Sequence, residues 1–191
     1  DFQATLETKP EKAIKLEKDA LAQIETITAD NARLVSNLHA NLGGLYRMNG
    51  HPDLAREHME KSISLLDQFN LLHINDSIPQ IANYAMFLTE QQEPERGISE
   101  LQKLSGIIKE YHSDHCLDYA KVQETLGTIY LMTANLPQAK THFKRAFKIY
   151  EKIWTDEPEM IEAKYQEIQE LYPQVGFFLG QQLSDFLTKQ T

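Results

Sequence analysis

The sequence has only one cysteine and no long apolar run. Cys116 cannot form an internal disulfide, so the fold does not depend on an oxidising compartment. No stretch approaches the ~20 apolar residues that a membrane-spanning helix needs. The N-terminal residues also lack the basic-then-apolar pattern of a signal peptide. Together these absences predict a cytoplasmic protein that does not associate with a membrane.

Positive charge is also scarce. The chain has 19 Lys and Arg residues against 28 Asp and Glu residues, which gives a formal net charge of −9. An acidic excess of this size disfavours binding to nucleic acid or to an anionic membrane surface, so we expect neither as a partner. Hydrophobic residues make up 41% and charged residues 25% of the chain, which is the balance of a folded domain.

Motifs that carry catalysis are missing. The sequence contains no G-x-x-x-x-G-K-[ST] loop, no G-x-S-x-G elbow and no H-E-x-x-H helix. Metal-binding residue types gather only in the segment HSDHC at 112–116, which includes His112, Asp114, His115 and Cys116. A structural metal site needs about four well-placed ligands, and this segment lies at a predicted helix junction. We interpret it as a capping loop and expect no enzyme activity, no catalytic residue, no cofactor and no metal.

A 42-residue period organises the chain. Leu42, Tyr84 and Leu126 are equally spaced, and a fixed period of this length indicates an array of stacked supersecondary units. The same step relates four further sets of three: Gly43, Ala85 and Gly127; Tyr46, Leu88 and Tyr130; Ala55, Gly97 and Ala139; and Met59, Leu101 and Phe143. Apolar residues at three- and four-residue spacing predict that every unit is a pair of helices.

The period predicts one domain over residues 1–191. A helix at 10–27, opened by Pro10, is the second half of a truncated repeat, which suggests that the parent protein continues upstream. Full repeats follow at 31–70, 73–112 and 115–154, and a partial repeat at 157–172. Residues 174–190 carry an apolar face outside the period. We interpret them as a C-terminal capping helix, because terminal units of arrays are atypical; the alternative is a helix that forms a homodimer.

These residues resemble the tetratricopeptide repeat family. Leu42, Gly43, Tyr46, Ala55 and Met59 match its pattern, as do Leu126, Gly127, Tyr130, Ala139 and Phe143. The middle unit departs from it at Ala85, Leu88 and Gly97, and the family's Trp is replaced by His39, Ile81 and Gln123. The long period resembles the kinesin-light-chain-like subgroup. The resemblance implies an all-α, right-handed superhelical solenoid of antiparallel helix pairs that binds a peptide or protein segment in its concave groove.

The resemblance also places the binding face on the first helix of each pair. Asn41 and Asn83 stand where the family often hydrogen-bonds the ligand backbone, whereas Thr125 replaces the third Asn. The alternative is that these Asn side chains only bond neighbouring helices. Periodicity exposes the following groove candidates: Asn37, Asn41, Gly44, Arg47, Met48, Asn83, Met86, Thr89, Glu90, Lys121, Glu124, Thr125, Thr128 and Met132.

Two features are open to more than one interpretation. Gly43 and Gly44 are glycines inside a predicted helix, and we expect both to allow close helix contact, because glycine there otherwise costs roughly 1 kcal/mol against alanine. Lys140, Lys144, Lys148 and Lys152 form a stripe with i,i+4 spacing, which is either a solvated face or a docking surface for an acidic partner.

The sequence therefore predicts a non-catalytic protein–protein interaction module with a protein or peptide ligand. One alternative is a sensor or scaffold segment of a larger signalling or transcription regulator. The other is a homo-oligomerisation domain that acts through residues 174–190.

Overall fold

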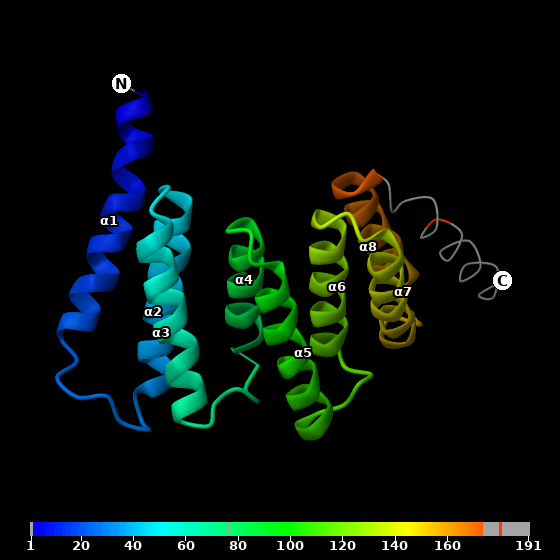
Figure 1. Ribbon diagram of the computed structural model, residues 1–191, viewed down its shortest axis with the longest axis horizontal. Helices are drawn as coiled ribbons and strands as arrows, with labels where there is room; N and C mark the ends of the chain where they lie inside the picture. The colour runs from blue at the N-terminus through cyan, green and yellow to red at the C-terminus, as the bar shows by residue number, and fades with distance from the viewer. Residues whose placement is uncertain (1, 76, 174–179, 181–191) are drawn as a thin grey trace. The chain divides into compact units, whose positions relative to one another are not determined.

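All regular structure in the described part of the chain is helical. The computed structural model describes residues 2–75, 77–173 and 180 (Figure 1). Its helices are α1 (Phe2–Ala22), α2 (Ala32–Met48), α3 (Pro52–Gln68), α4 (Ser77–Glu90), α5 (Pro94–Tyr111), α6 (Leu117–Met132), α7 (Leu136–Ile153) and α8 (Pro158–Leu171). The chain divides into two compact units, residues 1–100 and 101–191, and the division falls within α5. None of the described helices is both long and apolar enough to cross a membrane.

The same turn closes the first helix of each pair, which carries the 42-residue period into the backbone. One residue per turn has a positive φ: 74° at Gly50, 66° at Gln92 and 58° at Ala134. The next N–H then bonds a carbonyl five residues back, as in a Schellman C-cap: His51 N to Tyr46 O at 2.9 Å, Glu93 N to Leu88 O at 2.8 Å, and Asn135 N to Tyr130 O at 2.7 Å. A proline then lies in the first turn of each partner helix, at Pro52, Pro94 and Pro137.

The helices of two pairs, α2 with α3 and α4 with α5, meet at one glycine and one alanine. In the α2–α3 pair, a Cβ on Gly43 would lie 3.3 Å from the carbonyl oxygen of Ala55. In the next pair the residues are exchanged, and a Cβ on Gly97 would lie 2.6 Å from the carbonyl oxygen of Ala85. The middle repeat thus has alanine where the first has glycine and glycine where the first has alanine. The two backbones still approach closely.

The first unit is organised around a core from three helices. Leu42 and Tyr46 of α2 pack with Ala55 and Met59 of α3 and with residues 84, 87 and 88 of α4. In α1, Ile14 and Leu21 pack against this core. In the second unit Phe147 packs against Tyr165, with ring centroids 4.1 Å apart, which joins α7 to α8.

The first helix was predicted at residues 10–27, and both of these bounds are wrong. The first helix begins at Phe2 and ends at Ala22, so Pro10 lies inside it and does not open it. A proline removes one backbone hydrogen bond and disfavours a helix interior, but the residues on both sides continue the helical backbone past it. The predicted helix at 174–190, whether a cap or a dimerisation segment, lies outside the described residues apart from Gly180.

Candidate functional site

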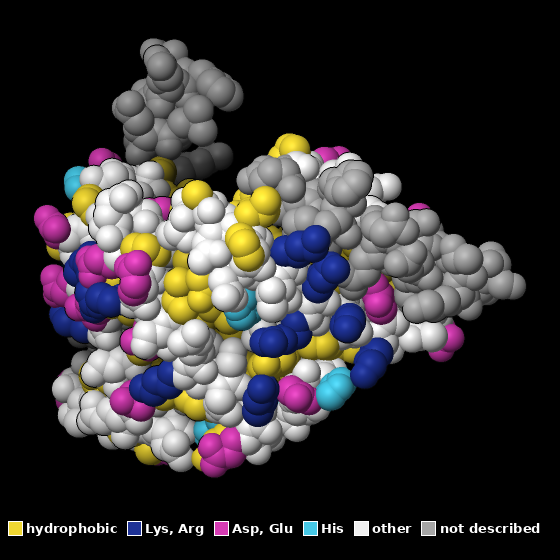
Figure 2. Space-filling model, turned by 45° about the vertical axis from the view of Figure 1, so that its right-hand side comes forward, with side chains coloured by type: hydrophobic (Ala, Val, Ile, Leu, Met, Phe, Trp, Pro, Cys, Tyr) yellow, Lys and Arg dark blue, Asp and Glu magenta, His cyan; other side chains and the backbone are white. Residues whose placement is uncertain are grey.

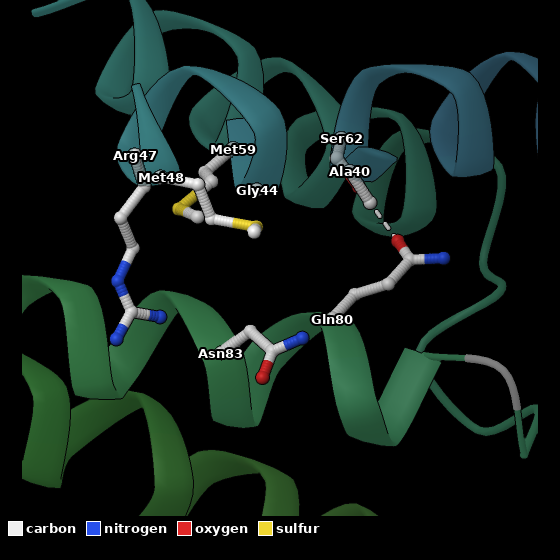
Figure 3. A pocket seen from close by; sticks show the side chains of 8 residues that line it. All are labelled: Ala40, Gly44, Arg47, Met48, Met59, Ser62, Gln80 and Asn83. Carbon is white, nitrogen blue, oxygen red and sulfur yellow. Dashed lines mark hydrogen bonds between the residues drawn. The ribbon is translucent and has the colours of Figure 1, made fainter. Parts of the chain in front are cut away.

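A cavity of about 160 Å³ opens between α2, α3 and α4 in the first unit. Figure 3 shows Arg47, Met48 and Met59 extending from the upper helices and Gln80 and Asn83 from the lower one. It is lined by Ala40, Gly44, Arg47, Met48, Met59, Ser62, Gln80 and Asn83. A cavity of about 150 Å³ is known to hold one benzene molecule, so this space fits one side chain of a ligand rather than a drug-sized molecule.

A buried hydrogen-bond network fixes one wall of the cavity. The hydroxyls of Ser36 and Ser62 lie 2.8 Å and 2.6 Å from the side-chain oxygen of Gln80, to which they donate. The amide nitrogen of Gln80 donates to Asn37 Oδ1. Ser36 and Ser62 are almost fully buried, so this network joins the three helices, and the polar groups of Gln80 are used within the protein.

An ion pair forms the other end. Arg47 Nε donates to Glu90 Oε2 at 2.8 Å, and Arg47 Nη2 donates to Glu90 Oε1. This two-point contact links the C-terminal turns of α2 and α4, and it pairs the only charged residue of the lining.

The polar group left for a ligand is the Asn83 amide. Asn83 is exposed on α4, and its side chain has no hydrogen bond to any other described residue. Beside it are two methionines of different exposure, since the surface of Met48 is 81% exposed and that of Met59 only 5%. Methionine side chains adapt their shape to what they contact, so the cavity combines a flexible apolar wall with one amide.

The two adjacent glycines of α2 have different surroundings. A Cβ on Gly43 would lie 2.6 Å from Cγ of Met59, so Gly43 serves helix packing as predicted. A Cβ on Gly44 would have no neighbour within 4 Å, and the expectation that Gly44 also serves close packing is wrong. Because Gly44 lines the cavity, its missing side chain leaves that space open.

Several predicted groove residues lie elsewhere. Asn41 donates to Glu17 Oε1 of α1 at 3.1 Å and does not line the cavity. Thr89 and Thr128 are buried, so the expectation that they are exposed is wrong. The hydroxyl of Thr89 donates to Ala85 O, and that of Thr128 to Glu124 O, which allows a threonine to be buried inside a helix.

In the second unit, the candidates of α6 lie on one helix, and Glu124 has structural partners. Lys164 Nζ lies 2.9 Å from Glu124 Oε1, and the Tyr150 hydroxyl donates to Glu124 Oε2 at 2.7 Å. Burial and the carboxylate of Glu124 raise the pKa of Tyr150. The remaining candidates are Lys121 and Met132, which are exposed, and Thr125, which is partly exposed and donates to Lys121 O. Met86, on α4 of the first unit, is also partly exposed.

Sequence reasoning missed three residues of the cavity. Gln80 and Ser62 carry its polar wall, and Met59 was assigned only to the core. The helical period could have placed Gln80 on the same side as Asn83, because the two are three residues apart. No sequence signal shows that Met59 and Ser62 of α3 reach the same space, since that depends on how three helices meet.

A histidine contact recurs between the paired helices. His39 Nδ1 lies 2.8 Å from His58 Nδ1, and His58 stacks on Tyr46. At the equivalent positions 84 residues later, His142 Nδ1 lies 2.9 Å from Gln123 Oε1 and stacks on Tyr130. The residues that replace the family's Trp, His39 and Gln123, therefore bond a histidine of the second helix.

The other two candidate features have simple surroundings. Cys116 caps α6, because its sulfur accepts from Tyr119 N at 3.4 Å, and no group of three His, Cys, Asp or Glu among the described residues is arranged to hold a metal ion. The residues of the lysine stripe, 140, 144, 148 and 152, are exposed on α7. Figure 2 shows Lys and Arg side chains gathered on part of the surface.

Comparison with known proteins identifies the repeats and the fold. Residues 77–152 match the tetratricopeptide repeat family. BtubC (BKLC) from P. vanneervenii is similar in structure, with a TM-score of 0.73 and 19% identity over 97% of this chain and 73% of that one. A protein from Podosopora anserina, assigned as a kinesin light chain with nearly identical TPR-like repeats, has a TM-score of 0.67 and 14% identity over 78% and 70% of the two chains. No curated protein matches the sequence.

These likenesses agree with the recurring turn, the reciprocal glycine and alanine contacts and the 42-residue spacing. The predicted fold class, an all-α helical-repeat superhelix, is confirmed. Residues 77–152 are identified as tetratricopeptide repeats, and the chain has the all-α helical-repeat fold of these two solved structures.

Proposed function

We propose that this chain is a non-catalytic binding module that holds an extended segment of a partner protein along α2 and α4 of the first unit. Tetratricopeptide repeats are generally protein-interaction modules. The observation that carries the proposal is the cavity between α2, α3 and α4, which has the free amide of Asn83 at its edge.

The contacts suggest how each part acts. An extended peptide presents one N–H and one C=O per residue, and a carboxamide can donate to the carbonyl and accept from the N–H at once. Asn83 therefore holds the ligand backbone, while a ligand side chain enters the cavity beside Met48 and Met59. Arg47 and Glu90 hold the two helices at the spacing this requires.

In the first step of the test, a peptide-display library is selected for binding to the immobilised chain. The affinities of the selected peptides for the parent and for Asn83→Ala are then measured by fluorescence anisotropy. A peptide hydrogen bond contributes about 1 kcal/mol, so loss of the Asn83 amide should weaken binding about fivefold or more. Because Asn83 is exposed, its replacement should leave the circular dichroism spectrum and the melting temperature unchanged.

Asn41→Ala is the matched control. It removes the same amide from an exposed position that bonds Glu17 and lies outside the cavity, so the peptides should bind this variant as they bind the parent. The proposal is wrong if no peptide is selected, or if selected peptides bind Asn83→Ala with parental affinity.

A further inference from the structure

Glycine at position 44 has no packing partner that explains it. It lies within α2, where glycine destabilises a helix relative to alanine, and a Cβ there would meet nothing within 4 Å. Its neighbour Gly43 is different, because a Cβ there would overlap Met59. The only feature that Gly44 serves in the described structure is the open space of the cavity that it lines.

The walls of this cavity offer a ligand no unpaired charge. Arg47 is held by Glu90, and the amide of Gln80 is bonded by Ser36, Ser62 and Asn37. A carboxylate or an ammonium entering here would lose water without gaining an opposite charge, which is unfavourable. Met48, Met59 and Ala40 supply apolar surface, which is complementary to an uncharged hydrocarbon group.

We infer that the cavity selects an uncharged apolar side chain of leucine or methionine size from the partner segment, and that Gly44 sets the size of group admitted. This inference rests on the proposed function. Asn83 recognises the ligand backbone regardless of the ligand's sequence. Gly44 and the pairing of Arg47 with Glu90 decide which ligand side chain can enter the cavity. Gly44 is thus a specificity-determining residue.

Capped amino acids probe this chemistry directly. N-acetyl-leucinamide carries the proposed side chain between two peptide groups, and N-acetylglutamate amide replaces it with a carboxylate. Binding is followed by NMR of the chain labelled in its methionine methyl groups. The leucine probe should shift Met48 and Met59 saturably, on the order of 1–10 mM, and leave Met132 and Met160 of the second unit unmoved. The glutamate probe should bind at least tenfold more weakly.

Gly44→Ala tests the specificity role, and Gly106→Ala is its matched control. Both positions lie inside helices with no neighbour within 4 Å of an added Cβ, and Gly106 of α5 does not line the cavity. Both variants should melt about 2 °C or more above the parent, since alanine favours the helix. Gly44→Ala alone should weaken the leucine probe at least fivefold, and its loss of binding cannot then be ascribed to unfolding.

Three results would overturn the inference: no saturable shift of Met48 and Met59, equal binding of the two probes, or parental binding of the leucine probe by Gly44→Ala. Its failure is separable from that of the proposed function. Selected peptides that depend on Asn83 but ignore Gly44 would leave the proposed function standing without this inference. If binding of the leucine probe depends on Gly44 but the chain selects no peptide, the preference of the cavity stands and the proposed peptide-binding function fails.

Discussion

The Nδ1 atoms of His39 and His58 lie 2.8 Å apart across the α2–α3 contact. One ring nitrogen must donate and the other must accept, so the contact requires at least one neutral imidazole. Burial, with the nearby His58 and Lys61, lowers the pKa of His39 to about 4, although Glu57 acts in the opposite direction. Burial also lowers the pKa of His58, partly opposed by Glu57.

Acid should therefore destabilise the chain. A histidine in an unfolded chain has a pKa of about 6.5, so below that pH the unfolded state takes up protons that the folded state excludes. The full stability is present above about pH 6.5 and decreases as the pH falls toward 4. We expect the free energy of unfolding to fall by roughly 1 kcal/mol for His39 between about pH 7.5 and 5, allowing for its partial exposure. Urea titrations at a series of pH values measure this.

His39→Gln should flatten that pH dependence while the chain stays folded, because Gln123 occupies the equivalent position and bonds His142. Exposed His115 provides the control, and His115→Gln should leave the slope as it is. If His39→Gln and the parent lose stability equally in acid, the histidine pair is not the cause. His142 should contribute in the same direction, since burial, with Arg145, lowers its pKa to about 4.

At the contact between Ala85 and Gly97, exchanging the two residues should be tolerated better than adding a methyl group at Gly97. Gly97→Ala would force a Cβ to within 2.6 Å of Ala85 O, and overpacking against backbone costs about 1–3 kcal/mol. The double variant Ala85→Gly with Gly97→Ala restores the arrangement of Gly43 and Ala55, so it should recover part of that loss. Thermal unfolding of the parent and the two variants tests this, and a Gly97→Ala variant as stable as the parent would contradict it.

Glu124 should act in stability rather than in ligand binding. Its side chain is 18% exposed and that of Lys164 is 19% exposed, so Glu124→Ala leaves the Tyr150 hydroxyl without a partner and the partly buried ammonium of Lys164 with Glu167 alone. We expect a loss of about 2–3 kcal/mol in the free energy of unfolding. Glu57 pairs with Lys61 at the surface, and Glu57→Ala should unfold at nearly the same urea concentration as the parent.

The two explanations of Glu124 give different results. If Glu124→Ala unfolds at the same urea concentration as the parent but loses affinity for selected peptides, Glu124 belongs to the binding face as the sequence suggested. Denaturation and anisotropy on the same preparation decide between them.

The repeat fold could be predicted because residues of the same type recur with the period, and each type has one structural role. Small residues recur where helices approach, as at Gly43 and Ala55, and a proline recurs at each second helix. The start of α1 could not be predicted in this way. A proline favours a first turn, and Pro10 lies within a helix that continues on both sides.

The candidate site was only partly predictable. Periodicity places Asn83 and Arg47 on the exposed side of their helices, but it assigned the same side to Thr89, whose hydroxyl bonds its own helix and is buried. Asn41 has the same type and register as Asn83, and only the position of Glu17 shows that it has another partner. Contacts between helices distant in sequence decide such cases, and one helix's pattern does not contain them.

Gly43 and Gly44 are neighbours in α2, but their surroundings constrain them differently. The first is constrained by Met59 of its own chain, while the second faces an open space. In evolution, Gly43 can therefore change only together with the residues it packs against. Gly44 can change alone whenever the partner protein changes. Among relatives that share this fold, we expect residue 44 to vary with the ligand and residue 43 to vary with the core.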